Sequence, residues 1–89
     1  MALSKDSPQS GILEIDIHGM TKQQAKQYVV SQIMRAPKSV YRIKVIHGYR
    51  GGTELRDMVR REIKNHDKVL RVEIGLNPGE TVLVLRELF

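Results

Sequence analysis

The chain has 89 residues, a length that allows one small domain. Lys and Arg outnumber Asp and Glu by 15 to 10, for a formal charge of +5, and the 40% of apolar residues can bury a core. The absence of cysteine excludes disulfides, thiolate zinc sites and cysteine nucleophiles. No apolar run approaches the roughly 20 residues of a membrane helix, and the start of the chain lacks the apolar block of a signal peptide. We therefore expect a cytoplasmic protein with no membrane partner.

The positive charge is concentrated in the middle of the chain. Residues 38–71 hold ten basic and four acidic side chains, whereas the remaining residues are slightly acidic in sum. A local positive excess attracts polyanions and favours a phosphate-rich partner such as nucleic acid. Excess charge also serves solubility, so charge alone leaves both interpretations open.

The first half of the chain predicts a strand and a helix. Residues 1–11 are polar and aperiodic, which predicts a disordered tail before a single domain over residues 12–89. Apolar and acidic residues alternate over residues 12–17, as in a strand with one buried face. Thr21 followed by Gln24 is a capping-box pattern, and apolar residues then recur at helical spacing until Pro37.

The second half repeats this order and adds a hairpin. Residues 41–46 alternate as a second strand, and a glycine-rich loop covers residues 47–52. Thr53 is the expected N-cap of a second helix that ends near Asn65 or His66. A third strand takes its apolar residues from Leu70, Val72 and Ile74, a turn covers residues 77–80, and a fourth strand covers residues 81–85.

These elements predict an α/β fold with the order βαβαββ. Two right-handed crossovers make the first three strands parallel, and the short last turn makes the fourth antiparallel to the third. The clean alternation of the first two strands means that one sheet face is open. We therefore expect a two-layer sandwich, a mixed four-stranded sheet with both helices on one face. The open face would carry Glu14, Asp16, Arg42, Lys44, Arg71 and Glu73.

Ligands of such sheets bind at the carboxyl ends of the parallel strands. Here this edge would bring together Asp16, His18 and His47, beside two helix N-termini whose free N–H groups suit a phosphate. Each residue also has a simpler interpretation, a solvated carboxylate or a turn-capping histidine. The three side chains also meet the count of a metal site with two histidines and one carboxylate.

The second loop and helix extend this candidate site. Arg56, Arg60 and Lys64 recur every four residues, which predicts a basic stripe on the solvent side of the helix, although an ordinary solvated face gives the same pattern. Tyr49 lies beside Arg50 at the predicted loop tip. An exposed aromatic ring next to a cation suits stacking on an unpaired base.

At these two loops the sequence resembles the Smr (small MutS-related) domain family. The first family motif corresponds to residues 15–19, Ile-Asp-Ile-His-Gly, and the second begins at His47 and Gly48. Arg50 stands where the family has glycine, and Gly51 and Gly52 follow as if the loop were one residue longer. A closing strand motif falls on residues 79–82. The resemblance covers residues 13–85 and implies a βαβαββ fold akin to the C-terminal domain of bacterial translation initiation factor three.

The resemblance also implies nucleic-acid binding and endonuclease activity on DNA or RNA. It assigns catalytic roles to Asp16, His18 and His47, no residue as a metal ligand, and leaves the cofactor open, with a divalent cation such as Mg²⁺ as a candidate. The expected nucleic-acid contacts are Gly48, Tyr49, Arg50, Gly51, Gly52, Arg56, Arg60 and Lys64. The alternatives are a non-catalytic RNA- or ribosome-binding module on the same basic surface, and a protein-interaction domain that uses the open sheet face. The altered second loop bears more on cleavage, which needs finer placement than binding.

Overall fold

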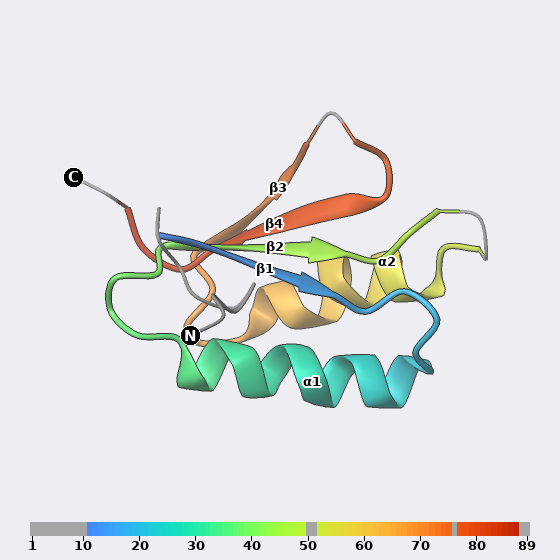
Figure 1. Ribbon diagram of the computed structural model, residues 1–89, viewed down its shortest axis with the longest axis horizontal. Helices are drawn as coiled ribbons and strands as arrows, with labels where there is room; N and C mark the ends of the chain where they lie inside the picture. The colour runs from blue at the N-terminus through green and yellow to red at the C-terminus, as the bar shows by residue number, and fades with distance from the viewer. Residues whose placement is uncertain (1–10, 50–51, 76, 88–89) are drawn as a thin grey trace, which may run out of the picture.

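The computed structural model describes residues 11–49, 52–75 and 77–87, in two layers (Figure 1). The predicted tail lies outside the described residues except for Gly11. The strands are β1 (Ile12–Asp16), β2 (Arg42–Ile46), β3 (Arg71–Ile74) and β4 (Glu80–Val84). The helical segments are α1 (Lys22–Arg35), α2 (Glu54–Asp57), and the continuation of α2 through η1 (Met58–Glu62) and η2 (Ile63–Asn65). No helix in the described ranges is long and apolar enough to cross a membrane.

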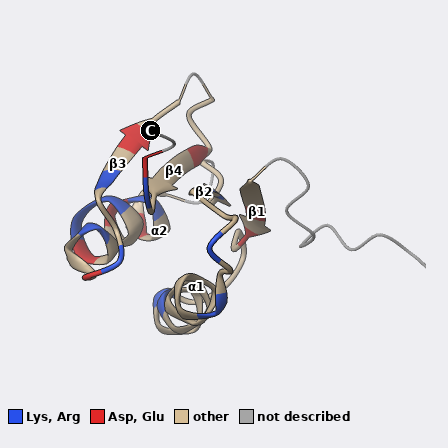
Figure 2. Cartoon of the chain, turned by 90° about the vertical axis from the view of Figure 1, so that its left-hand side faces the viewer, with Lys and Arg blue, Asp and Glu red and all other residues tan. Residues whose placement is uncertain are grey.

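The predicted α/β sandwich is confirmed, with a mixed four-stranded sheet and the helices on one face (Figures 1 and 2). The strand order is β1-β2-β4-β3, so the last strand of the chain lies inside the sheet. β1 and β2 are parallel, and β4 is antiparallel to both β2 and β3. The predicted strand directions are therefore correct. The position of β4 next to β2 was not predicted. It brings Thr81 of β4 into hydrogen-bond contact with His47 of the second loop.

The alternation in the first two strands gives the buried face that the pattern predicts. Leu13, Ile15, Ile43 and Val45 are all at most 4% exposed and pack on the helices. α1 begins at the predicted capping box, in which the Gln24 N–H donates to the Thr21 hydroxyl at 3.1 Å and the Gln24 side chain accepts from the Thr21 N–H. This cap fixes where the chain turns from the end of β1 into the helix.

The second helix has the predicted extent but not a uniform winding. After one α-helical turn, the Ile63 N–H donates to the Met58 carbonyl five residues back, and the last turn tightens to a 3₁₀ helix. Thr53 precedes the helix as predicted, but its hydroxyl makes no cap. It donates instead to the Asp57 carboxylate at 3.0 Å, and this hydrogen bond holds the pKa of Asp57 below its usual value. The wide turn means that residues four apart do not stay on one line.

The third strand is less buried than its alternation predicts. Val72 packs against the core, but Leu70 is 57% exposed and Ile74 is 67% exposed, and Leu70 precedes the strand. β3 forms an edge of the sheet, and among the described strands only β4 lies beside it. The alternation therefore places Leu70 and Ile74 on the helix side of the strand with Val72, but unlike Val72 both are largely open to solvent.

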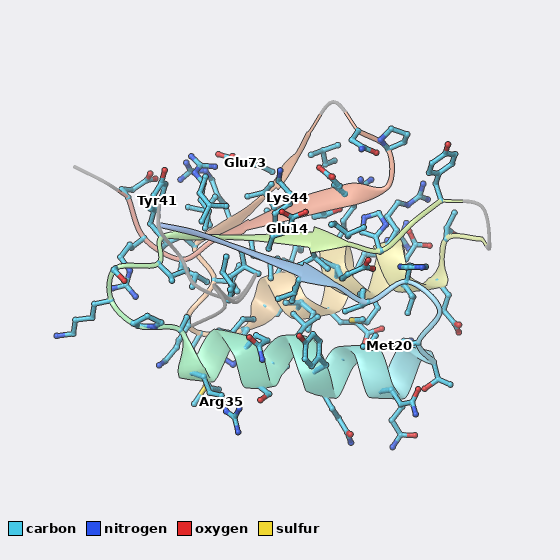
Figure 3. The ribbon with its side chains drawn as sticks, viewed as in Figure 1. Glu14, Met20, Arg35, Tyr41, Lys44 and Glu73 are labelled. Atoms are coloured by element: carbon cyan, nitrogen blue, oxygen red, sulfur yellow. The ribbon has the colours of Figure 1, made fainter. Side chains whose placement is uncertain are left out.

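The open face carries the charged residues that were expected on it. Glu14 and Lys44 are partners across β1 and β2, and Figure 3 shows them in a row with Glu73 across the sheet. Glu73 is ion-paired with both Arg42 and Arg71. The hydrogen bond from Arg42 is the main reason why the pKa of Glu73 is lowered. This face is thus held by an ion-pair network rather than by a second layer of helices.

Candidate functional site

The two predicted loops lie side by side at the carboxyl ends of β1 and β2. The Ile17 N–H donates to the Ile46 carbonyl at 2.9 Å, which ties the two loops together as they leave the sheet. Gly48 has a φ of +78°, and a β carbon added to it would lie 3.5 Å from the β carbon of His18. Between the loops and the start of α2 lies a cleft of about 540 Å³. It is lined by His18, Gly19, Met20, Ile46, His47, Gly48, Tyr49, Gly52, Glu54 and Leu55.

Asp16 and His18 form a hydrogen-bonded pair at the edge of this cleft. Oδ1 of Asp16 lies 2.5 Å from Nδ1 of His18 and also accepts the His18 backbone N–H at 3.1 Å. The side chain of His18 is 70% exposed and that of Asp16 is 50% exposed. A carboxylate at Nδ1 holds the proton of a neutral imidazole there and leaves Nε2 as the basic atom. Within the described part of the chain, no residue is bonded to Nε2.

His47 differs from His18 in almost every respect. It is 5% exposed, and burial lowers its pKa, so the ring is neutral at pH 7. Nδ1 lies 2.8 Å from the Gly48 carbonyl, which can only accept, so Nδ1 carries the ring proton. Nε2 then accepts a hydrogen bond from the Thr81 hydroxyl, also at 2.8 Å. Both ring nitrogens are therefore occupied within the fold.

Thr81 and Arg60 complete a buried chain of hydrogen bonds behind the second loop. Nε of Arg60 donates to the Thr81 hydroxyl oxygen at 2.8 Å, and that hydroxyl donates onward to His47. Thr81 is fully buried on β4 and directly opposite Val45 of β2. Burial lowers the pKa of Arg60, which is half-buried. The expectation that Arg60 lies on the solvent side of the helix is therefore wrong, because the wide turn over residues 58–62 brings it beside the apolar face.

The backbone of the second loop is held by the turn before β4. The N–H groups of His47 and Gly48 both donate to the Gly79 carbonyl, at 2.9 and 3.0 Å. The N–H of Gly48 is thus hydrogen-bonded within the protein. It is not free to donate to a phosphate, contrary to the expectation from the sequence. Tyr49 is 60% exposed and lies next to Gly79, where an added β carbon would come within 3.3 Å of its ring. Gly79 therefore lets the tyrosine lie against the turn and face the cleft.

The other predicted contact residues are dispersed. Arg50 and Gly51 lie outside the described residues, and Gly52 lines the cleft. Arg56 is half-buried near the start of α2, where its side chain pairs with Asp57 at 3.3 Å and its charge contributes to lowering the pKa of His47. Lys64 is exposed and lines a separate groove beside β3.

The residues that could hold a metal ion are not grouped. Asp16 and His18 lie together, but the ring of His47 is turned into the fold, and no group of three His, Asp or Glu side chains among the described residues could hold a metal ion. The donor set for a cation such as Mg²⁺ is therefore not assembled by this part of the chain.

Thr81, whose hydroxyl is hydrogen-bonded to His47, was not singled out as a site residue by the residue patterns. It belongs to the closing motif at residues 79–82, and it has the same strand parity as the buried Leu83 and Leu85. A hydroxyl at a buried strand position needs a hydrogen-bond partner inside the fold, and in the structure that partner is His47. His47 also continues the alternation of Ile43 and Val45, which places its ring on the helix side of the sheet. This alternation could have predicted that His47 is buried.

Comparisons with known proteins agree with the fold and with the family resemblance. No curated protein matched the chain by sequence. The crystal structure of the Smr domain of Thermus thermophilus MutS2 superposes with a TM-score of 0.75, at 24% sequence identity, covering 83% of this chain and 98% of that one. That likeness supports the fold. The family model of the Smr domain matches residues 15–80, which include both loops and the first two residues of the closing motif. The chain therefore belongs to the Smr domain family, which is known for nucleic-acid binding and nicking.

Proposed function

We propose that this protein is a cytoplasmic nucleic-acid-binding domain that cleaves phosphodiester bonds, with His18 as the proton-transfer group. The observation that carries the proposal is the Asp16 and His18 pair at 2.5 Å on the rim of the cleft. It combines a titratable ring that is open to solvent with a carboxylate that fixes which nitrogen is basic. His47, the histidine of the second motif, instead has both ring nitrogens hydrogen-bonded within the fold.

The chemistry of such a pair is general base catalysis. Nε2 of His18 takes a proton from the attacking oxygen, which is a water or a ribose 2′-hydroxyl, as that oxygen bonds to phosphorus. The bond from phosphorus to the leaving oxygen breaks, and the leaving oxygen takes its proton from solvent or from the His18 imidazolium. Asp16 stabilises the imidazolium that forms between these steps, as a carboxylate does in other histidine-dependent enzymes.

The cleft suits an unpaired nucleotide better than a regular duplex. Its wall includes the apolar side chains of Met20 and Leu55, and the exposed Tyr49 ring stands beside them. A base can stack on such a ring only after it has left the stack of a duplex. The charge of Arg56 acts on His47 behind the second loop, and we propose Arg56 as the contact for a backbone phosphate. We therefore expect single-stranded or distorted nucleic acid as substrate.

Binding without cleavage is the second candidate function, and one observation favours it. The resemblance gives catalytic roles to histidines of both motifs, yet His47 has both ring nitrogens engaged. With His18 alone, the same cleft would serve an RNA-binding or ribosome-binding module. In both functions His47 keeps the second loop in place through its bond to the Gly48 carbonyl.

The test is to incubate the protein with labelled single-stranded RNA and DNA over a salt series, with Mg²⁺ and with a chelator. We expect salt-dependent binding and strand cleavage, and an Arg56→Gln variant whose log–log salt slope is smaller by about one. Arg35→Gln is the matched control, because Arg35 lies at the end of α1 far from Met20 and the cleft (Figure 3). Salt-insensitive affinity would refute nucleic-acid binding. Tight binding with no cleavage under either condition would leave the non-catalytic module.

A further inference from the structure

The outer edge of β3 is an unusual surface for a small domain. β3 ends the sheet, and among the described strands only β4 pairs with it. Its flanks carry two large apolar side chains in solvent, Leu70 at 57% and Ile74 at 67% exposure. A groove of about 460 Å³ beside it is lined by Arg60, Lys64, Asn65, Leu70, Arg71, Val72 and Ile74. Exposed sheet edges with apolar side chains favour the addition of another strand.

The opposite edge of the sheet, formed by β1, is protected against the addition of another strand. β1 has Glu14 and Asp16 exposed on its open face and no basic residue in the strand. A second copy paired antiparallel on β1 would set carboxylates near carboxylates, which is destabilising. β3 instead alternates a basic and an acidic residue, Arg71 and Glu73, on its open face (Figure 2).

This alternation makes β3 complementary to itself. Consider two copies of β3 running antiparallel, with the Val72 residues opposite each other. Arg71 then faces the partner's Glu73, and Glu73 faces the partner's Arg71, so opposite charges meet twice on the open face. On the helix side, Leu70 faces the partner's Ile74, and the reverse pair repeats it. The two exposed apolar residues thereby cover each other.

We propose that the partner for this edge is a second copy of the chain, which joins two four-stranded sheets into one sheet through a twofold axis at Val72. A twofold interface requires that the same surface be complementary to itself, and β3 meets this condition in both charge and apolar pairing. The cleft at β1 and β2 stays uncovered, because β1 lies at the opposite edge of the sheet. The strand has only four residues, so the interface is small and the dimer is weak.

Sedimentation velocity of the full chain, at concentrations up to about 1 mM, tests the proposal. We expect a monomer–dimer equilibrium in the wild type. Arg71→Glu and Glu73→Arg should each weaken association by about tenfold, because each places like charges opposite each other twice. An equimolar mixture of the two variants should associate again, since each variant supplies the charge that the other lacks. Glu14→Arg, a charge reversal on the opposite edge, is the matched control and should leave association unchanged.

Circular dichroism of each variant separates a lost interface from a lost fold. Arg71 is exposed and Glu73 is half-buried. None of their ion pairs, with each other, with Arg42 and with Glu87, is fully buried, so the variants should fold. A wild type that stays monomeric up to about 1 mM overturns the proposal, and so does a mixture that associates no better than the separate variants. Neither result depends on nucleic-acid binding, which is measured at the other edge of the sheet.

Discussion

His18 and His47 follow adjacent parallel strands, yet they occupy opposite chemical environments. His18 is exposed and bonded to a carboxylate, and its Nε2 is available to a substrate. His47 is buried and neutral, with a carbonyl at one ring nitrogen and a hydroxyl at the other. The difference comes from strand parity. Asp16, which orients His18, belongs to the open face of β1, whereas His47 continues the buried face of β2.

The comparison favours the proposed division of roles, in which His18 exchanges protons and His47 supports the second loop. A histidine that exchanges protons needs access and an unbonded nitrogen. The side chain of His18 is 70% exposed, and no described residue is hydrogen-bonded to its Nε2. A histidine that fixes a loop needs partners on both nitrogens and little water, and His47 has these. Substitutions at the two positions should therefore separate effects on rate from effects on stability.

The largest effect is expected for His18→Ala on cleavage. The variant should lose at least about a hundredfold in cleavage rate, as is usual for the loss of a general base, with little change in nucleic-acid affinity. Single-turnover cleavage and a binding titration on the same substrate measure the two quantities. Asp16→Asn keeps the shape of the pair and should reduce the rate by a smaller factor. Equal cleavage by wild type and His18→Ala would show that His18 is not the catalytic group.

The next effect is expected on stability, from Thr81→Val. Valine has the shape of threonine but leaves both Nε2 of His47 and Nε of Arg60 without their buried partner. We expect the free energy of unfolding to fall by about 1–3 kcal/mol, the usual cost of an unpaired buried polar group. Urea unfolding measures it, and His18→Ala is the control that should stay within about 0.5 kcal/mol of wild type. An unchanged stability in Thr81→Val would mean that the hydrogen-bond chain contributes nothing.

The smallest effect is a pH dependence that belongs to His47. Burial lowers its pKa from the ordinary value of 6.5, so the unfolded chain binds this proton more readily than the folded one. The stabilisation from the neutral ring is complete above pH 6.5 and is lost as the pH falls from there towards the lower folded pKa. Unfolding curves at pH 7 and pH 5 should show a larger loss of stability in wild type than in His47→Gln, which cannot titrate. Equal losses would contradict the buried, neutral state of the ring.

Local patterns predicted most of the fold and only part of the site. Alternation and capping residues gave the elements, their directions and the open face, because these depend on neighbours in the sequence. The position of β4 between β2 and β3 depends on pairing between distant segments, which no local pattern contains. As a result, Thr81 was not connected with His47. Arg60 was misplaced for a different reason, since the four-residue spacing assumes a regular α-helix and the helix widens there.

The place of β4 also bears on how the chain reaches this fold. Arg42 of β2 pairs with Val84 of β4, roughly 40 residues further along the chain, so the middle of the sheet forms from the paired strands that are most separated in the sequence. During synthesis, β1 and β2 can pair early, but β3 has no strand beside it until β4 has left the ribosome. Until then the exposed edges of β2 and β3 are open to other chains, which is the period when aggregation competes with folding. A chain that stops before Glu80 would lose the centre of its sheet rather than an edge.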